Sequence, residues 1–521
     1  MRNLIAQTIK DNWDNDVFES IKMKHFFRRI KKIYNILTFL EVTSSTKVGI
    51  YGNNSSNWVA VYIATLLKGC TLVIIPPYMT RTEMLHYMVS TEVNHLFLDT
   101  KDSSIINTFK KESLLPLQTV FNMNTLETIL IPSNMYNALI DMNIILNEEL
   151  YSKELLLEND YPNDVETIIT PTLGTQFAEQ KFVVHSSTSI MKFLESASKE
   201  MPFKQFDKLQ ISASYSRFHL VNVLIPFIKG CVITNNKDDA DYFIESTESF
   251  ERMWKYIVQP MFYRRLYSKL LSKKSWYWLY RIVVLLILRK HYNLKHSKGI
   301  MILNNEIHEG AMSILRNSGF PLFSTYGSQE TNQLVAINDY STISLRKQNC
   351  VGAILDNYTA TIVDKEVCLI SDSIFNKYHD DERYSEHVTE TGWYKTGDIG
   401  KISGSGQYLS IYGRKNSYYK GDDLTLDELE RLIRGLPFVQ ESILFISDDE
   451  LYLSVYLDRN FIESKEWGYI KSKQFLVNFR ETINTEIKPD IKIKQISISP
   501  NPFEKTFDGS IRKYLYRNVI G

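Results

Sequence analysis

The sequence predicts an α/β protein: a large N-terminal domain of doubly wound, mostly parallel sheets with a β-rich subdomain, followed by a small α+β domain. Three observations support this fold class. The chain has 521 residues and is 44% hydrophobic, so it is globular and too long for one ordinary core. Short β-rich runs alternate with helical runs before residue 235. Near residue 350 the runs become shorter, and after residue 413 an α+β pattern begins.

The alternating runs form two series that follow an amphipathic helical stretch at residues 24–40. Such alternation is typical of parallel strands joined by crossover helices. The expected helices lie at residues 57–67, 81–90, 187–199 and 220–228. The expected strands lie at residues 47–51, 71–75, 95–99, 166–170, 208–212 and 231–234.

The change of pattern places the expected domain boundary next to Gly413. We expect an N-terminal domain of residues 1–412, with its β-rich subdomain at about residues 335–412, and a C-terminal domain of residues 413–521. Roughly 100 residues are enough for a small separate domain. The expected strands of the subdomain lie at residues 352–363 and 366–371. Beyond Gly413 we expect helices at residues 425–434 and 472–487 and strands at residues 442–447, 451–457 and 491–499.

Charge and cysteine content argue against several kinds of partner and site. Sixty basic residues balance sixty acidic ones, so nothing favours nucleic acid as a partner. The four cysteines lie far apart without a CxxC pair, which argues against a metal cluster or a disulfide framework and fits a cytoplasmic location. No apolar segment follows a basic one at the start of the chain, so we expect no secretory signal.

The strongest apolar run, residues 282–288, raises the question of membrane contact. A spanning helix needs about 20 apolar residues, whereas this run is bounded by Arg281 and Arg289. Its aromatic lead-in at residues 276–280 and its basic flanks suit a helix lying at a lipid interface. The alternative is a buried helix of the large domain, since apolar runs usually belong to a core. Peripheral membrane contact therefore stays open as an interpretation.

Three ordered segments jointly describe a nucleotide site. Residues 326–331 read Tyr-Gly-Ser-Gln-Glu-Thr, with an aromatic ring that can lie against a purine and a carboxylate, Glu330, that can hold a magnesium ion bridging phosphates. Residues 392–398 end in Asp398, an acceptor for ribose hydroxyls. Arg414 adds a guanidinium for the same sugar. A solvated loop carboxylate and a turn-forming Gly-Asp are the structural alternatives for the two acidic residues taken singly.

The ordered trio resembles the adenylate-forming superfamily, which includes acyl-CoA synthetases, luciferases and the adenylation domains of peptide synthetases. The resemblance extends to residues 47–58 and 69–77, which look like the beginning of the first sheet of these enzymes, and to residues 503–513, which look like their terminal loop. It implies ATP-dependent activation of a carboxylic acid. It also implies that the C-terminal domain is a mobile lid with a hinge near Asn416, a kind of closure that gates many enzymes.

The family's phosphate loop corresponds to residues 170–181, between a strand-like and a helix-like run. Activation brings two anions together, so this loop has to stabilise charge. Gly174, Thr175 and Lys181 match the family pattern, but Phe177 or its neighbour replaces the second glycine. A bulky residue at such a glycine weakens a phosphate cradle.

The resemblance assigns roles to the matching residues. Tyr326, which the motif residue Gly327 follows, would stack on adenine, and Glu330 would bind Mg²⁺. Asp398 and Arg414 would bind ribose, and Lys181 would face phosphate. Lys420 matches a catalytic lysine of a later motif, with a solvated turn lysine as the alternative. Ser510 stands where the family carries another catalytic lysine, and losing one well-aimed donor can cost on the order of 10² to 10³ in rate. Lys505 or Lys513 would substitute only if the loop shifted its register.

The helical stretch before residue 300 looks like that of long-chain fatty acyl-CoA synthetases, although Asn304 and Asn305 replace small residues of the family pattern. We therefore expect an ATP- and Mg²⁺-dependent ligase that forms an acyl-adenylate and then a thioester, with a fatty acid and coenzyme A as the first expectation. Two alternatives stay open. One is a catalytically weak or inactive homologue that binds nucleotide or acyl-adenylate as a pathway partner. The other is a ligase that loads an acyl carrier protein.

Overall fold

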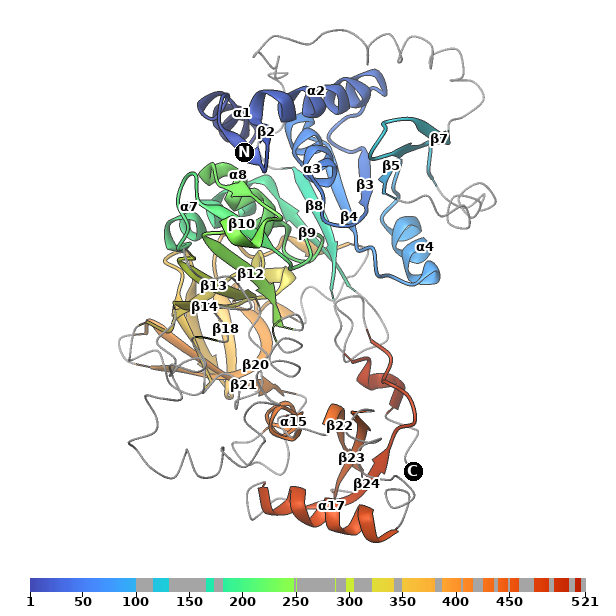
Figure 1. The fold of residues 1–521 in the computed structure, drawn as a ribbon, viewed down its shortest axis with the longest axis vertical. Coiled ribbons are helices and arrows are strands. Elements are labelled where there is room, and N and C mark those ends of the chain that lie inside the picture. The colour runs from blue at the N-terminus through green and yellow to red at the C-terminus, as the bar shows by residue number, and fades with distance from the viewer. Residues whose placement is uncertain are drawn as a thin grey trace.

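A computed structural model shows the arrangement of helices and strands (Figure 1). It describes residues 1–99, 116–130, 165–172, 181–247, 250, 286, 297–303, 321–341, 349–379, 387–403, 406–415, 425–434, 439–447, 450–458, 473–486, 492–505 and 511–516. Across these residues the strands form a 13-stranded, an 8-stranded and a 3-stranded sheet. This mixed α/β architecture confirms the predicted fold class.

The 8-stranded sheet is parallel at its centre and antiparallel at its edges. Its order is β19 (Lys377–Tyr378), β9 (Phe182–Ser186), β8 (Glu166–Pro171), β4 (Thr71–Ile75), β3 (Lys47–Tyr51), β5 (His95–Leu98), β6 (Thr119–Asn122) and β7 (Thr128–Leu130). The strand β19 comes from much later in the chain than its neighbours, so it brings distant residues to this sheet.

The helices cover both faces of the large sheets, as Figure 1 shows. The longer ones are α1 (Arg2–Asp11), α2 (Met23–Phe39), α3 (Ser56–Lys68), α4 (Arg81–Ser90) and α7 (Ser187–Glu200), and α8 (Ile225–Lys229) has five residues. The helices α15 (Leu426–Arg434) and α17 (Lys473–Glu486) pack on the 3-stranded sheet instead. The short ones are the π-helix η2 (Leu220–Leu224) and the 3₁₀-helices η3 (Lys237–Asp239), η6 (Gln329–Thr331) and η9 (Lys513–Tyr516).

Helix α3 is buried on all sides because its sequence is apolar almost throughout. It begins where the Ser55 hydroxyl accepts a hydrogen bond from the Trp58 N–H (3.1 Å), and it ends at Gly69 in the left-handed conformation (φ 83°). The side chains of β4 alternate between two hydrophobic cores, one on each face of the sheet. Leu72 and Ile74 join the core of α3, whereas the intervening side chains join the core of α4 on the other face.

The 13-stranded sheet changes character at β14 (Leu322–Tyr326). From β14 to β1 (Asp16–Phe18) neighbouring strands are parallel, through β13 (Gly299–Leu303), β12 (Tyr242–Ser246), β10 (Lys208–Ile211) and β11 (Val232–Ile233), with β2 (Ile21–Lys22) antiparallel at that edge. On the other side of β14 all neighbours are antiparallel. They are β15 (Ala336–Asp339), β16 (Cys350–Ile354), β21 (Tyr408–Arg414), β20 (Tyr394–Ser403), β18 (Glu366–Ile370) and β17 (Thr359–Val363).

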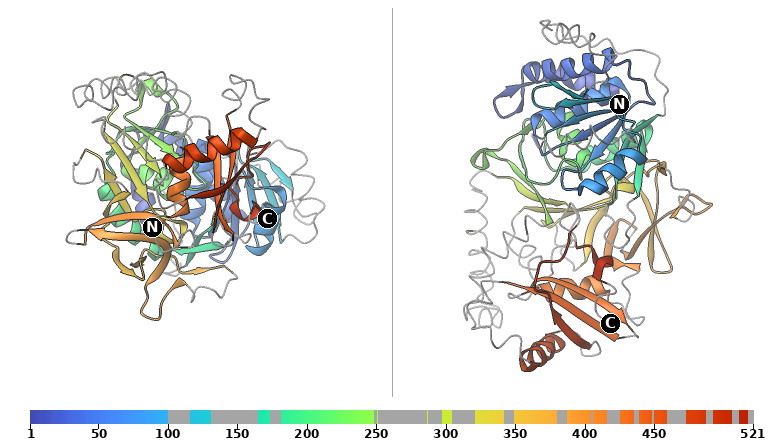
Figure 2. Two further views of the ribbon diagram at one scale, coloured as in Figure 1. Left: turned by 90° about the horizontal axis from the view of Figure 1, so that it is seen from below. Right: turned by 90° about the vertical axis from the view of Figure 1, so that its right-hand side faces the viewer.

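The 3-stranded sheet has its own core. It contains β22 (Val439–Ser447), β23 (Glu450–Leu457) and β24 (Ile493–Ile498), and its apolar side chains pack against α15 and α17. Figure 1 shows this sheet at the end of the molecule opposite α1 and α2, and Figure 2 shows the same separation from the side. Whether the chain divides into domains at residue 413 stays a prediction.

Two expected elements are built differently in the structure. The expected strand at residues 352–363 is two strands, β16 and β17, because the chain turns after Leu355, whose carbonyl accepts the Tyr358 N–H at 3.0 Å. The intervening Asp356 and Asn357 favour such turns. The expected helix at residues 220–228 begins as the π-helix η2 before it becomes α8.

The apolar run at residues 282–288 lies outside the described residues, apart from the exposed Leu286. In the described part of the chain, no helix combines the length and apolar character that crossing a bilayer requires. All four cysteines are described and buried, and no disulfide joins them.

Candidate active site

Three of the predicted nucleotide-binding residues meet around one carboxylate. Asp398 on β20 and Arg414 on β21 are cross-strand partners, and Arg414 Nε lies 3.2 Å from Asp398 Oδ1. Tyr326, at the end of β14, donates from its hydroxyl to Asp398 Oδ2 at 2.6 Å. Both oxygens of the carboxylate are therefore held in place by residues from separate segments.

The charges in this group favour the neutral form of Tyr326 and the charged form of Arg414. Burial, together with the adjacent Asp398 charge, raises the pKa of Tyr326 well above its usual value, so its hydroxyl stays a donor. The same carboxylate raises the pKa of Arg414. Asp398 is 13% exposed, and a carboxylate has about four acceptor positions, so it can still accept a sugar hydroxyl. These donors and acceptors fit the ribose of a nucleotide.

Gly327 shapes the loop that follows Tyr326. A Cβ at this position would lie 2.5 Å from the carbonyl carbon and oxygen of Gln333, so only glycine fits. The close approach lets Val335 N–H donate to the Tyr326 carbonyl at 2.7 Å. Gly327 thus has a structural reason to be glycine, independent of any ligand.

A second group joins Glu330 to Lys181 across the two large sheets. Glu330 lies in η6, and its Oε1 accepts from the hydroxyl of Tyr378 on β19 at 3.1 Å. Lys181, at the start of β9, holds its ammonium 4.7 Å from the centre of the Tyr378 ring. Its Nζ is also 2.5 Å from Nε2 of His387. An acidic and a basic side chain therefore face one tyrosine.

Tyr394 lies between the two groups. Burial raises its pKa, and the charges of Glu330, Arg414 and Asp398 all act on it, which places it within electrostatic reach of both. Its ring packs edge-on against Phe375, with centroids 5.5 Å apart. Phe375 in turn contacts Tyr378, with ring centroids 4.6 Å apart, so an aromatic row runs from Tyr394 to the tyrosine that Glu330 and Lys181 contact.

Glu330 fits a magnesium ion that is shared with phosphates. Within the described residues no cluster of three His, Cys, Asp or Glu side chains could hold a metal ion by itself. Mg²⁺ usually binds one or two carboxylates and completes its shell with water and substrate phosphates. A single carboxylate therefore suits a phosphate-bridged ion and does not suit an all-protein metal site.

Comparison with known proteins identifies the family. A family model described as AMP-binding enzyme matches residues 15–371. The chain belongs to the AMP-binding enzyme family. Long chain acyl-CoA synthetase 2 of Arabidopsis thaliana is 26% identical over 171 residues, which are 29% of this chain and 25% of that relative. The match thus spans about a quarter of the relative's length.

Solved structures share the fold over nearly the whole chain. ATP-bound MatB from Rhodopseudomonas palustris has a TM-score of 0.74 at 15% identity, with 99% of this chain and 98% of that chain covered. The fatty acyl CoA synthetase of Mycobacterium tuberculosis has a TM-score of 0.64 at 15% identity, with 100% and 98% covered. The predicted membership of the adenylate-forming superfamily is confirmed.

Several predicted residues of this AMP-binding enzyme lie outside the described residues. They are Gly174, Thr175, Lys420 and Ser510. The Thr172 N–H donates to the Lys181 carbonyl at 2.7 Å, and the Lys181 N–H donates to the Thr172 hydroxyl at 3.0 Å. Strand β9, which was not among the expected strands, follows directly and leads into α7, the expected helix. The β-branched Val183 and Val184 are the local signal for that strand.

The two lysines near Ser510 are engaged in ion pairs. Lys505 Nζ lies 2.8 Å from Glu441 Oε1, and Lys513 Nζ lies 2.8 Å from Asp427 and 2.7 Å from Glu430. Asp427, the partner of Lys513, also accepts the Arg414 N–H at 3.2 Å with its other carboxylate oxygen. Both lysines are therefore held by carboxylates that follow residue 413, and the Lys513 pair lies next to Arg414.

Arg512 is the residue of this C-terminal segment that reaches the large sheets. Its Nη2 lies 2.5 Å from Oε1 of Glu83 in α4, and the two side chains are 14% and 20% exposed. Glu83 also forms the capping box of α4 with Thr80. Burial works to raise the pKa of Glu83, but the hydrogen bonds from Thr80 and the Arg512 charge outweigh it and hold the pKa below its usual value.

Some residues of the site could not be found from sequence motifs. Tyr378 and His387 carry no motif, and Tyr378 reaches Glu330 only because β19 pairs with β9. Gln329, which replaces the family's threonine, donates to the Arg217 carbonyl at 2.8 Å and accepts from the Thr170 hydroxyl at 3.3 Å. It thereby ties the end of β8 to the loop that carries Glu330.

Proposed function

We propose that the protein is an ATP- and Mg²⁺-dependent ligase that joins a carboxylic acid to AMP and then transfers the acyl group to the thiol of coenzyme A. The arrangement of Tyr326 and Arg414 around the carboxylate of Asp398 carries this proposal, because it supplies ribose-binding groups in a family that binds AMP. A fatty acid is the proposed substrate. The name of the Arabidopsis relative supports that choice.

On this proposal the group around Asp398 binds the sugar, and the group of Glu330 and Lys181 binds the phosphates. Asp398 and Arg414 bind the ribose hydroxyls and fix the nucleotide. Lys181 places positive charge near the phosphates, and Glu330 holds Mg²⁺, which when bound offsets phosphate charge as the acid approaches. An oxygen of the acid bonds to the α-phosphorus while the bond to pyrophosphate breaks. The thiol sulfur then bonds to the acyl carbon, AMP leaves, and the thiol proton passes to solvent.

The contact between Arg512 and Glu83 supports a further part of the proposal, in which residues 413–521 act as a lid. A half-buried ion pair between the two parts would favour one docked arrangement, and its loss would favour movement. Lys420 is proposed to act in the second step, in which the lid has moved.

A catalytically weak homologue is the second candidate, and one observation favours it. Lys505 and Lys513, the lysines nearest to Ser510, are held in ion pairs inside the C-terminal part. Without a substitute for the missing lysine, the first step would be slow on the order of 10² to 10³-fold. Such a protein would bind nucleotide or acyl-adenylate without rapid turnover.

The deciding experiment is acid-dependent exchange of pyrophosphate into ATP by the purified full chain, across fatty, short and aromatic acids. Turnover with fatty acids, followed by thioester formation when coenzyme A is added, is the expected result. A parallel reaction with an acyl carrier protein tests the other acceptor. ATP binding by calorimetry without exchange for any acid would favour the weak homologue and contradict the ligase.

A further inference from the structure

Strand β20 carries a bulge opposite β18, and the bulge holds Asp398. Glu366 of β18 pairs with Ile399, whereas Cys368 pairs with Lys395. Two steps along β18, from 366 to 368, therefore match four along β20, from 395 to 399. Bulges bend a strand and redirect its side chains, often beside functional sites. This one directs Asp398 toward Tyr326 and Arg414.

Glu366 satisfies the backbone that the bulge leaves without a ladder partner. Gly397 in the bulge has a left-handed backbone (φ 73°), and its N–H donates to Glu366 Oε1 at 2.9 Å. The hydroxyl of Thr396 donates to the Val367 carbonyl at 2.8 Å and accepts from the Asp398 N–H at 3.1 Å. The residue directly before Asp398 is thus fastened to β18 by a buried carboxylate.

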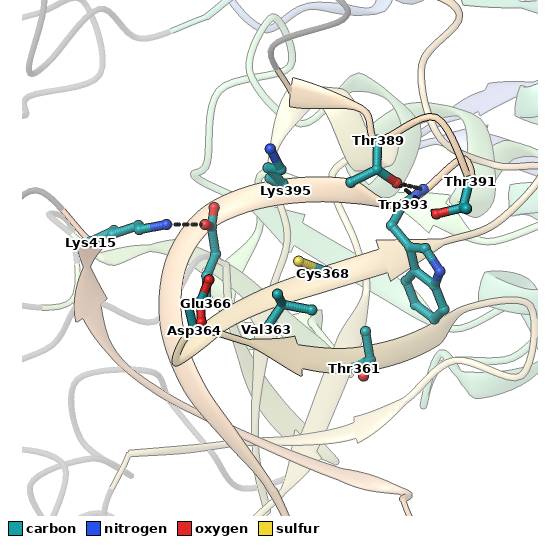
Figure 3. Close-up of a pocket in the computed structure, with 10 residues that line it drawn as sticks. All are labelled: Thr361, Val363, Asp364, Glu366, Cys368, Thr389, Thr391, Trp393, Lys395 and Lys415. Carbon is teal, nitrogen blue, oxygen red and sulfur yellow. Dashed lines mark hydrogen bonds and ion pairs between the residues drawn. The ribbon is translucent and has the colours of Figure 1, made fainter.

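The second oxygen of the same carboxylate holds the residue directly after Arg414. Lys415 Nζ lies 2.7 Å from Glu366 Oε2, as the dashed line in Figure 3 shows, and the two side chains are 49% and 8% exposed. The hydrogen bond to Glu366 raises the pKa of Lys415, so the ammonium stays charged. One carboxylate therefore connects the neighbours of both Asp398 and Arg414.

The surroundings of this pair allow it to be tested without disturbing a core. Glu366 and Lys415 lie at one end of a cavity of about 260 Å³, and Trp393 lies at its other end (Figure 3). The half-exposed Lys415 side chain can therefore be shortened or made neutral without a clash. Glu366 is mostly buried, so its own replacement needs a milder companion variant.

We propose that Glu366 is a positioning residue for nucleotide binding. It sets the separation of Asp398 and Arg414 by holding Gly397 with one oxygen and Lys415 with the other. The inference rests on the proposed function to the extent that these two side chains bind ribose. Strand pairing alone fixes the backbones of β20 and β21, whereas the carboxylate fixes the bulge that departs from regular pairing.

The test measures the affinity of the full chain for AMP by calorimetry and the KM for ATP and for the acid in pyrophosphate exchange. Glu366→Ala is expected to weaken AMP binding and to raise the KM for ATP at least tenfold, with the KM for the acid unchanged. Glu366→Gln keeps an acceptor for Gly397, and Lys415→Met removes only the ion pair, so each is expected to lose about threefold. The double variant is expected to lose no more than either single one, because both remove the same pair.

Asp207 provides a matched control. Its Oδ2 accepts the Lys204 N–H at 2.6 Å and its Oδ1 pairs with Lys298 Nζ at 2.5 Å, so it makes the same two kinds of contact as Glu366. It precedes β10, far along the sheet from β20. Asp207→Ala is expected to lower the melting temperature without changing AMP affinity.

The AMP affinities of the wild type and the variants test the proposed function and the role of Glu366 separately. Wild-type protein that does not bind AMP would overturn the proposed function and this inference together. If the wild type binds AMP and the AMP affinity of Glu366→Ala is within twofold of it, the inference alone is overturned. The same follows if Asp207→Ala loses as much AMP affinity as Glu366→Ala. If Glu366→Ala does not fold, unchanged AMP affinity in both Glu366→Gln and Lys415→Met would overturn it.

Discussion

The ribose group and the phosphate group of the candidate site are built in different ways. In the ribose group, Asp398 and Arg414 are direct partners on neighbouring strands of one sheet, and Tyr326 reaches the same carboxylate. In the phosphate group, Glu330 lies in η6 and Lys181 directly precedes β9, and both contact Tyr378 of β19. Strand register fixes the first group, and contacts between sheets fix the second.

The difference indicates how each group would contribute to a reaction. On the proposed function, ribose contacts are the same before and during the transfer of the adenylyl group, so losing them weakens substrate binding. Phosphate and metal contacts meet charge that develops in the transition state, so losing them slows the chemical step. We therefore expect variants of the two groups to separate into KM and kcat effects.

The largest effect is expected for Glu330→Gln. Losing the charge that would hold Mg²⁺ should lower kcat for adenylate formation on the order of 10² to 10³-fold, with a small change in the KM for ATP. Pyrophosphate exchange at varied ATP and Mg²⁺ measures both constants. The exposed Glu390 provides the control Glu390→Gln, which should behave as wild type. A kcat of Glu330→Gln within threefold of wild type would show that Glu330 does not hold the metal.

A smaller effect, on the KM for ATP, is expected for Asp398→Asn. The amide keeps the shape of the side chain but loses the charge that Arg414 faces, and a hydrogen bond to a charged group contributes about 1.5–3 kcal/mol. The KM for ATP should rise roughly 10 to 100-fold while kcat stays within threefold. Asp372→Asn, at an exposed position, serves as the control. A loss confined to kcat would contradict the division between the two groups.

A still smaller effect is expected for Arg512→Ala, which removes the contact with Glu83. Ion pairs of this kind contribute about 1 kcal/mol, so the first step should slow about fivefold with the KM for ATP unchanged. Single-turnover adenylate formation gives the rate. Lys494→Ala breaks an ion pair with Glu450 inside the C-terminal sheet and is the control. If Arg512→Ala and Glu83→Gln slow the step additively, the two side chains do not act as a pair.

The smallest effect concerns pH. The pKa of Glu83 is held below its ordinary value of 4.5, so its ionised form stabilises the folded protein above about pH 4.5, and this contribution is lost as the pH falls through the lowered pKa. The difference in melting temperature between wild type and Glu83→Gln should therefore shrink from pH 6 toward pH 4. A difference that grows on acidification would mean that the carboxyl is protonated in the folded protein.

The sequence predicted most of the fold because its apolar periodicities are regular. Helix α4 and the strands β3 and β4 have the bounds that the sequence indicated, and α15, α17 and the strands between them were also expected. The ribose group was predicted for a related reason. Asp398 and Arg414 stand in nearly intact motifs, and the pairing of two neighbouring strands makes them cross-strand partners.

The rest could not be predicted because it depends on contacts between distant segments. Tyr378 joins the site through the edge strand β19, and neither its neighbours nor its spacing distinguish it from other tyrosines. The carboxylate of Glu366 acts through a bulge that only the pairing of β18 and β20 reveals. Periodicity reports which face of a strand is buried but contains no information about such long-range partners.

The buried cysteines have a practical consequence for following movement of the C-terminal part. The thiolate is the form that reacts with maleimides, and burial raises the pKa of both Cys70 and Cys231 to about 12. All four native thiols are enclosed in the folded chain. A single cysteine introduced at the exposed Val477 of α17 would therefore take up a fluorophore selectively, and the native sequence would need no other change before labelling.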